Sequence, residues 1–278
     1  MARYMSFRRP DGTASFGRVE GELVVDLGRA DKADNLADCL DGDLTALPAI
    51  ASYPIVSVEL LPVIPNPGKI LCIGLNYATH VAETGREQKE YPAVFTRWAD
   101  TLVAAGKPLV RPRESTKFDY EGELALVIGK PGRRIPREDA MAHIAGYAVF
   151  NDGSVRDWQQ HNIQFTPGKN FPDTGGFGPE LVTPDEVDDV TALRVQTRLN
   201  GQLVQDQPIS DLIWDIPFLV SYCSTFTHLA PGDVILTGTP GGVGAKRKPP
   251  LFMKEGDTVV VNIDTIGSLT NPIVDEPA

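Results

Sequence analysis

One stretch, residues 119–129, constrains the fold of this 278-residue chain more than any other. It reads Asp-Tyr-Glu-Gly-Glu-Leu-Ala-Leu-Val-Ile-Gly, a mostly apolar run of β-forming residues that ends at a glycine. We therefore predict a buried strand here. Because side chains alternate along a strand, Glu121 and Glu123 would project from the same face, about 6–7 Å apart.

Two neighbouring carboxylates in apolar surroundings repel each other and lose hydration. Both are driven towards protonation unless a cation joins them. A hard divalent metal ion is the simplest such cation. The alternative is an edge strand on which Glu121 and Glu123 face water.

A second buried strand is predicted over residues 144–152, ending at Asp152. Residues 154–157 have the form of a capping box, which predicts a helix that carries Arg156 and Gln159 on one face. Asp152 is then a candidate third metal ligand beside an anion-binding face. The alternative is an ordinary strand–turn–helix corner in which Asp152 stabilises the turn. The metal hypothesis requires Asp152 to lie close to the glutamates, with no arginine or lysine head group among them.

A short helical turn is predicted within residues 76–85, where His80 and Glu83 are i, i+3 neighbours on one face. Such a pair fixes one imidazole tautomer and raises its basicity, as a general base requires. The alternative is a surface turn with a chance ion pair. The highly charged segment 86–90 that follows is predicted to be a mobile surface flap.

Residues 165–179 are predicted to be a loop throughout, because glycines and prolines interrupt any regular pattern. Lys169 is a candidate active-site lysine in this loop, and a solvated loop lysine is the alternative. A strand that runs into a glycine-rich loop is predicted over residues 231–244. Backbone amides there, or the Thr239 hydroxyl, could contact an oxyanion.

The composition excludes several classes of protein. A net charge of −11 and an isoelectric point near 4.8 argue against a nucleic-acid surface. No run of residues approaches the length of a membrane span, and the first residues lack the pattern of a signal peptide. The three cysteines are widely spaced, which excludes a cysteine-type zinc site and fits a reducing compartment. We therefore expect a cytoplasmic protein.

Two unequal domains are predicted. Residues 1–65 would form a small N-terminal domain, with a β-meander over residues 4–27 and short helices over 31–40 and 44–51. A proline-rich connector then leads into a larger catalytic domain, residues 66–278.

Several of these motifs follow one another in a fixed order: Gly74-Leu75-Asn76-Tyr77 with His80 and Glu83, Asp119-Tyr120-Glu121-Gly122-Glu123-Leu124, Asp152 with Arg156-Asp157, Gly168-Lys169, and Leu236-Thr237-Gly238-Thr239-Pro240. This ordered set resembles the fumarylacetoacetate hydrolase family, and the resemblance extends from residue 69 to the C-terminus. One departure is Arg97, where many relatives carry lysine.

The resemblance implies an α+β fold, in which a multilayer mixed β-sheet rolls around the active site with a few peripheral helices and a small N-terminal α/β domain. It also implies a homodimer. A Mg²⁺ ion, or Mn²⁺ or Ca²⁺, would be held by Glu121, Glu123 and Asp152.

The resemblance further assigns roles to individual side chains. The implied catalytic residues are His80, Glu83 and Lys169. The implied substrate-binding residues are Tyr77, Arg156, Gln159, Gly238 and Thr239.

The implied activity is metal-dependent hydrolysis of a C–C bond in a β-diketone or acylpyruvate-type oxo acid, as in the catabolism of aromatic compounds. Water activated by a histidine–glutamate pair would attack the substrate. The alternative is a decarboxylase, isomerase or lyase that acts on a related 2-oxo acid, such as oxaloacetate, at the same metal site. The expected partner is a small oxo acid, with no nucleic acid and no membrane.

Overall fold

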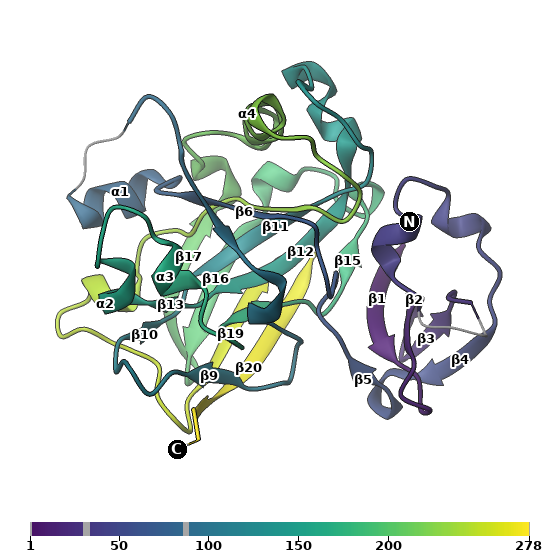
Figure 1. Cartoon of the computed structure of the whole chain (residues 1–278), viewed down its shortest axis with the longest axis horizontal. Helices are drawn as coiled ribbons and strands as arrows, with labels where there is room; N and C mark the ends of the chain where they lie inside the picture. Colours follow the sequence, from purple (N-terminus) through teal and green to yellow (C-terminus); the bar gives the residue numbers. More distant parts are fainter. Residues whose placement is uncertain (1, 30–33, 86–88, 278) are drawn as a thin grey trace.

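The computed structural model describes residues 2–29, 34–85 and 89–277, and it has an α+β architecture built mainly from strands (Figure 1). The described chain contains four α-helices: α1 (Ala78–Thr84), α2 (Arg156–Gln159), α3 (Thr166–Lys169) and α4 (Ile216–Phe226). The predicted fold class is confirmed. No helix in the described ranges is long and apolar enough to cross a membrane.

The main sheet joins the N-terminal part of the chain to the rest. Its path runs in the order β4 (Ala51–Pro54), β3 (Leu23–Asp26), β2 (Ala14–Glu20), β1 (Arg3–Arg8), β15 (Leu181–Val182), β12 (Ile144–Asp152), β11 (Gly122–Ile128), β18 (Val234–Leu236), β6 (Ile70–Gly74) and β7 (Ala93–Arg97). Three short strands pair beside this path: β5 (Glu59–Leu60), β8 (Leu102–Val103) and β14 (Gly175–Phe177).

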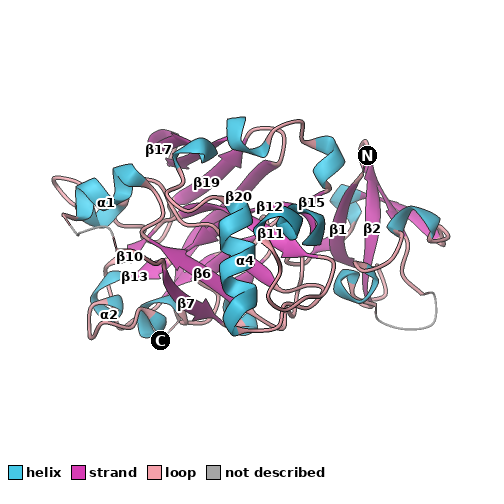
Figure 2. Ribbon diagram, turned by 90° about the horizontal axis from the view of Figure 1, so that it is seen from above, coloured by secondary structure: helices cyan, strands magenta, loops and turns pink. Residues whose placement is uncertain are grey.

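Two smaller sheets complete the fold. One follows the order β17 (Gln202–Pro208), β16 (Arg194–Leu199), β19 (Thr258–Ile263), β20 (Gly267–Asp275) and β9 (Leu109–Arg111). The other pairs β10 (Phe118–Asp119) with β13 (Ser154–Val155). Figure 2 shows α4 lying across one side of the main sheet.

Strands β11 and β12 are buried on both faces, which explains their nearly continuous apolar sequence. Leu124 and Leu126 of β11 pack in a core with α4 and the second sheet. Ala125 and Val127, on the opposite face, pack in a second core that includes residues of β1 and β2. Because side chains alternate, Glu123 lies on the face of Ala125 and Val127.

The predicted meander at the N-terminus is confirmed, since β1, β2 and β3 pair antiparallel in sequence order. The two predicted helices that follow are wrong. The described residues there form short 3₁₀ turns, Leu36–Cys39 and Leu44–Ala46, capped by the side chains of Asn35 and Asp43. Such side chains stabilise a local turn in place of a longer helix. Residues 30–33 lie outside the described chain.

The predicted strand over residues 119–129 is divided in two. Phe118 and Asp119 pair with β13 in a separate sheet, and the long strand β11 begins only at Gly122. The Asp119 carboxylate accepts hydrogen bonds from the amides of Tyr120 and Gly244, so it serves a local bend.

Two further local predictions are wrong. Ser154 is not a helix cap, because it lies in β13 and its hydroxyl donates to the Asp152 carbonyl. Residues 165–179 are not a loop throughout, because they contain α3 and β14. Proline is compatible with the first turn of a helix, where Pro167 lies, and β14 gains its hydrogen bonds from β12.

Candidate active site

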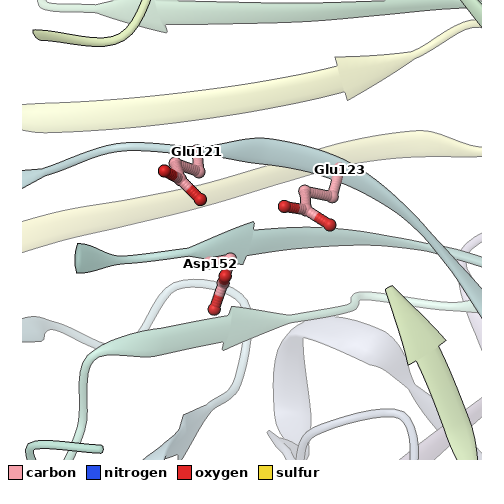
Figure 3. Close-up of side chains that lie close together, drawn as sticks. All are labelled: Glu121, Glu123 and Asp152. Carbon is pink, nitrogen blue, oxygen red and sulfur yellow. The ribbon is translucent and has the colours of Figure 1, made fainter. Parts of the chain in front are cut away.

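The three predicted carboxylates meet at the ends of β11 and β12. The Asp152 amide donates to the Glu121 carbonyl at 2.8 Å, so Asp152, at the end of β12, lies opposite Glu121, the residue before β11. Figure 3 shows the side chains of Glu121, Glu123 and Asp152 lying close together. One carboxylate oxygen from each lies within 4.8 Å of the others, and all three residues are buried.

Cationic side chains surround this acidic group. The Lys169 ammonium lies 2.6 Å from Glu121 Oε2 and 2.5 Å from Asp152 Oδ2. Arg156 donates to the other Glu121 oxygen at 2.6 Å, and Arg97 donates to Asp152 Oδ1 at 2.8 Å. The acidic residues therefore come together as predicted, but the second requirement is not met, because a lysine head group contacts two of them.

Glu123 is the carboxylate that these cations leave least compensated. Burial raises its pKa well above the usual range, and the nearby charges of Asp152 and Glu121 raise it further. Burial would also raise the pKa of Glu121, but Lys169 and Arg156 outweigh this effect and lower it. The backbone amide of Gly238 donates to Glu123 Oε2 at 2.8 Å.

This uneven compensation fits a divalent cation. Four buried carboxylates, including Asp119, face three buried cationic side chains, so one negative charge is in excess. A spread of 4.8 Å is close to twice the metal–oxygen distance of about 2.0–2.6 Å found for Mg²⁺ and Ca²⁺. Glu121, Glu123 and Asp152 therefore form a group that could bind a divalent metal ion.

Helix α1 carries the predicted histidine–glutamate pair. His80 Nδ1 lies 2.8 Å from Glu83 Oε1, and His80 is buried. The second oxygen of Glu83 accepts the Gly242 amide at 2.8 Å, which ties the helix to the glycine-rich loop. With Glu83 ionised, the proton of the neutral imidazole lies on Nδ1, and Nε2 is the basic nitrogen. Of the predicted flap that follows, residues 86–88 lie outside the described chain.

Lys169 and Arg156 come from the adjoining helices α3 and α2. A Cβ atom on Gly168 would lie 2.4 Å from the Gln159 amide, so glycine is what lets the helices approach this closely. Arg156 donates to Asp119 at 2.7 Å and to Gln159 Oε1 at 3.0 Å. Its remaining nitrogen, Nη2, is buried and has no hydrogen-bond partner.

The other predicted substrate-binding residues occupy different places. The Thr239 hydroxyl donates to the Gly122 carbonyl and accepts from Gln205. Tyr77 is fully buried, and its hydroxyl has no hydrogen-bond partner.

A cavity of about 330 Å³ opens onto this group. Of the predicted site residues, seven line it: His80, Glu121, Glu123, Arg156, Gln159, Lys169 and Thr239. Glu83, Asp152, Tyr77 and Gly238 are not among the lining residues, although the first two contact side chains that are.

Two buried charged residues were given no role by sequence reasoning. Arg97 bonds Asp152, Thr174 and the Gly153 carbonyl through its whole guanidinium group. Asp119 holds Arg156 and the backbone of the glycine-rich loop. Their sequence signal is weak, because a charged residue next to an apolar run can equally mark the solvent-exposed end of a strand.

Comparison with known proteins identifies the family of this chain. The model for the fumarylacetoacetate (FAA) hydrolase C-terminal domain matches residues 69–274. The chain belongs to this family. It is therefore an enzyme of the fumarylacetoacetate hydrolase superfamily, as the ordered motifs predicted. The boundary predicted between residues 65 and 66 stays a prediction, although the family match begins close to it.

The proteins that are similar to this chain are named for different activities. A mitochondrial oxaloacetate tautomerase of Xenopus laevis is 44% identical over 220 residues, which cover 78% of this chain and 69% of the relative. A 5-carboxymethyl-2-hydroxymuconate delta-isomerase from Mycobacterium smegmatis is 32% identical, with a TM-score of 0.83 and coverage of 99% and 100%. A fumarylacetoacetate hydrolase from Exiguobacterium antarcticum is 33% identical, with a TM-score of 0.85 and the same coverage.

Proposed function

We propose that this protein is a metal-dependent tautomerase that interconverts the enol and keto forms of a 2-oxo acid of the oxaloacetate type. The observation that carries the proposal is the 44% identity to an oxaloacetate tautomerase, in a chain that brings a histidine–glutamate pair and an acidic group to one cavity. This favours the isomerase alternative over the hydrolase expected first.

Glu121, Glu123 and Asp152 would hold the metal, with Mg²⁺ as the first candidate because all three ligands are carboxylates. When bound, the ion would supply Lewis-acid polarisation of a carbonyl oxygen. Arg156 Nη2, a buried donor without a partner, would donate a hydrogen bond to the substrate carboxylate.

His80 would move the proton. Tautomerisation from keto to enol transfers a proton from C3 to the oxygen on C2, while the C3–H electron pair becomes the C2–C3 double bond. His80 Nε2 is the basic nitrogen of the pair, so it would take the C3 proton. Glu83 fixes the ring and stabilises the imidazolium that forms. Lys169 has its ammonium in the cavity wall, and its three N–H groups donate to Glu121 and Asp152. Its positive charge would stabilise the negative charge that develops on the oxygen on C2.

Hydrolysis of a C–C bond is the second candidate, and the similarity to a fumarylacetoacetate hydrolase favours it. The same His80 nitrogen would then take a proton from water, which attacks the distal carbonyl group.

The cytoplasmic location and the homodimer, both expected from the sequence, are part of this proposal.

The test is an assay of products as well as of substrate loss. With Mg²⁺ or Mn²⁺, we expect the enol absorbance of oxaloacetate to decay faster than with the metal ion alone, while pyruvate forms no faster than in that enzyme-free control. The His80→Ala variant should lose this activity and keep its metal affinity. Cleavage of acylpyruvates into two acids, without an effect on enol-oxaloacetate, would instead establish the hydrolase.

A further inference from the structure

The cavity contains one cationic side chain that the acidic group does not use. Three basic residues line it: Arg156, Lys169 and Lys246. The first two form ion pairs with buried carboxylates. Among the described residues, Lys246 forms no ion pair, and its side chain is exposed. Its charge is therefore available to a ligand.

The backbone that carries Lys246 is held firmly beside Arg156. The Asp119 carboxylate accepts the amides of Gly244 and Ala245 at 2.8 and 2.9 Å, and it also accepts the Arg156 guanidinium at 2.7 Å. A Cβ atom on Gly244 would lie 2.5 Å from the same carboxylate, so only glycine allows this approach. One buried carboxylate thus fixes both the arginine and the turn that presents the lysine.

The next residue in the turn is also fixed, but away from the cavity lining. Arg247 donates to the Tyr120 hydroxyl, the Gly242 carbonyl and the Val204 carbonyl. These bonds hold the turn rigid. Of the two basic residues Lys246 and Arg247, therefore, only Lys246 lines the cavity.

We propose that Lys246 binds the second carboxylate of the substrate and selects short 2-oxo dicarboxylic acids over monocarboxylic ones. This inference rests on the proposed function, in which Arg156 and the acidic group receive the 2-oxo acid end. The charge of the cavity supports it. The buried group has one negative charge in excess, so a bound divalent ion together with Lys246 would make the site net positive. A substrate with two negative charges complements that field better than a substrate with one.

The test compares two enols that share the 2-oxo acid end, those of oxaloacetate and phenylpyruvate. Lys246→Gln should raise the KM for enol-oxaloacetate by about tenfold, the loss of one charged contact, and leave kcat within about twofold. Its kinetics with enol-phenylpyruvate should stay unchanged. Lys246→Arg should restore most of the loss. The control is Lys254→Gln, which removes the same charge from an exposed position outside the cavity lining. An equal effect on both enols, or none on oxaloacetate, would overturn the inference.

A binding measurement separates this inference from the proposed function. Calorimetry with Mg²⁺ present would compare 2-oxoglutarate with 2-oxopentanoate, which differ by the terminal carboxylate. We expect the wild-type protein to prefer 2-oxoglutarate, and Lys246→Gln to remove the preference. If that holds in a protein without tautomerase activity, the proposed function fails and the role of Lys246 stands. If the enzyme is active but the wild type and Lys246→Gln show the same preference between the two ligands, the role of Lys246 fails and the proposed function stands.

Discussion

Arg97 Nε lies 2.8 Å from Asp152 Oδ1, and neither side chain is exposed to solvent. The other guanidinium nitrogens donate to the Thr174 hydroxyl and the Gly153 carbonyl, so each of the three nitrogens makes a hydrogen bond. Arg97 therefore determines where the Asp152 carboxylate points. A residue outside the cavity lining thus shapes the candidate metal centre.

Replacement of Arg97 with methionine should lower the free energy of unfolding by about 3–5 kcal/mol, because Asp152 would lose a buried partner. Urea denaturation monitored by fluorescence would measure this loss. The double variant Arg97→Met with Asp152→Asn should recover a substantial part of it, since no unpaired charge is then buried. Equal stability of the single and the double variant would show that the unpaired charge of Asp152 is not the cause of the loss.

Replacement of Glu123 with glutamine should weaken divalent metal binding by at least about 10–100-fold. The same change should stabilise the metal-free protein at pH 8, because the neutral amide replaces a carboxylate that is costly to ionise. Titration with Mn²⁺ and thermal unfolding in chelator would measure the two effects. The exposed Glu114→Gln is the matched control.

The raised pKa of Glu123 also makes the stability of the metal-free protein depend on pH. The folded protein holds the Glu123 proton more tightly than the unfolded chain. The metal-free wild type should therefore lose stability as the pH rises from the unfolded pKa, about 4.3, towards the higher folded value. Glu123→Gln should show a smaller decline over this range. Identical pH profiles would contradict the assigned cause.

Replacement of Glu83 with glutamine should reduce activity by about 10²-fold or more, with a change in stability below about 1 kcal/mol. The amide oxygen can still accept the Gly242 amide, but the amide nitrogen would then donate to His80 Nδ1 and move the ring proton to Nε2. Nitrogen NMR of the imidazole would report the tautomer. Loss of activity with the wild-type tautomer retained would assign a different role to Glu83.

The three cysteines should react with a thiol reagent to different extents. Burial raises the pKa of Cys223 to about 12, and it raises the pKa of the fully buried Cys72 well above the usual range. Cys39 is half-buried, and burial raises its pKa as well. We expect one thiol per chain to react in the native protein, faster as the pH rises from 7 to 9, and three in guanidinium. Rapid labelling of Cys223 in the native state would contradict its burial.

Sequence patterns sufficed for the parts of the site that depend on local geometry. Alternation along a strand brings Glu121 and Glu123 to one side, and the i, i+3 spacing brings His80 to Glu83. Both relationships are fixed by the backbone of a few consecutive residues. Asp152 followed because the two buried strands are adjacent and antiparallel.

The remaining parts depend on contacts between distant segments, which periodicity does not encode. Lys169 reaches the carboxylates only because residues 165–179 fold into α3 and β14 rather than a loop. Asp119 binds amides 125 and 126 positions further along the chain. Sequence patterns do not distinguish a tautomerase from a hydrolase, because both reactions would use the same base and the same acidic metal ligands.

The pairing of β1 with β15 has a consequence for any attempt to shorten the protein. Tyr4 and Phe16 pack in the same core as Phe150, which lies in β12 two residues before Asp152. A fragment starting at residue 66 would leave β15 with a bare row of amide and carbonyl groups and uncover apolar side chains beneath it. We expect such a fragment to aggregate or to express poorly. The N-terminal strands therefore cover an edge of the catalytic sheet that would otherwise be exposed.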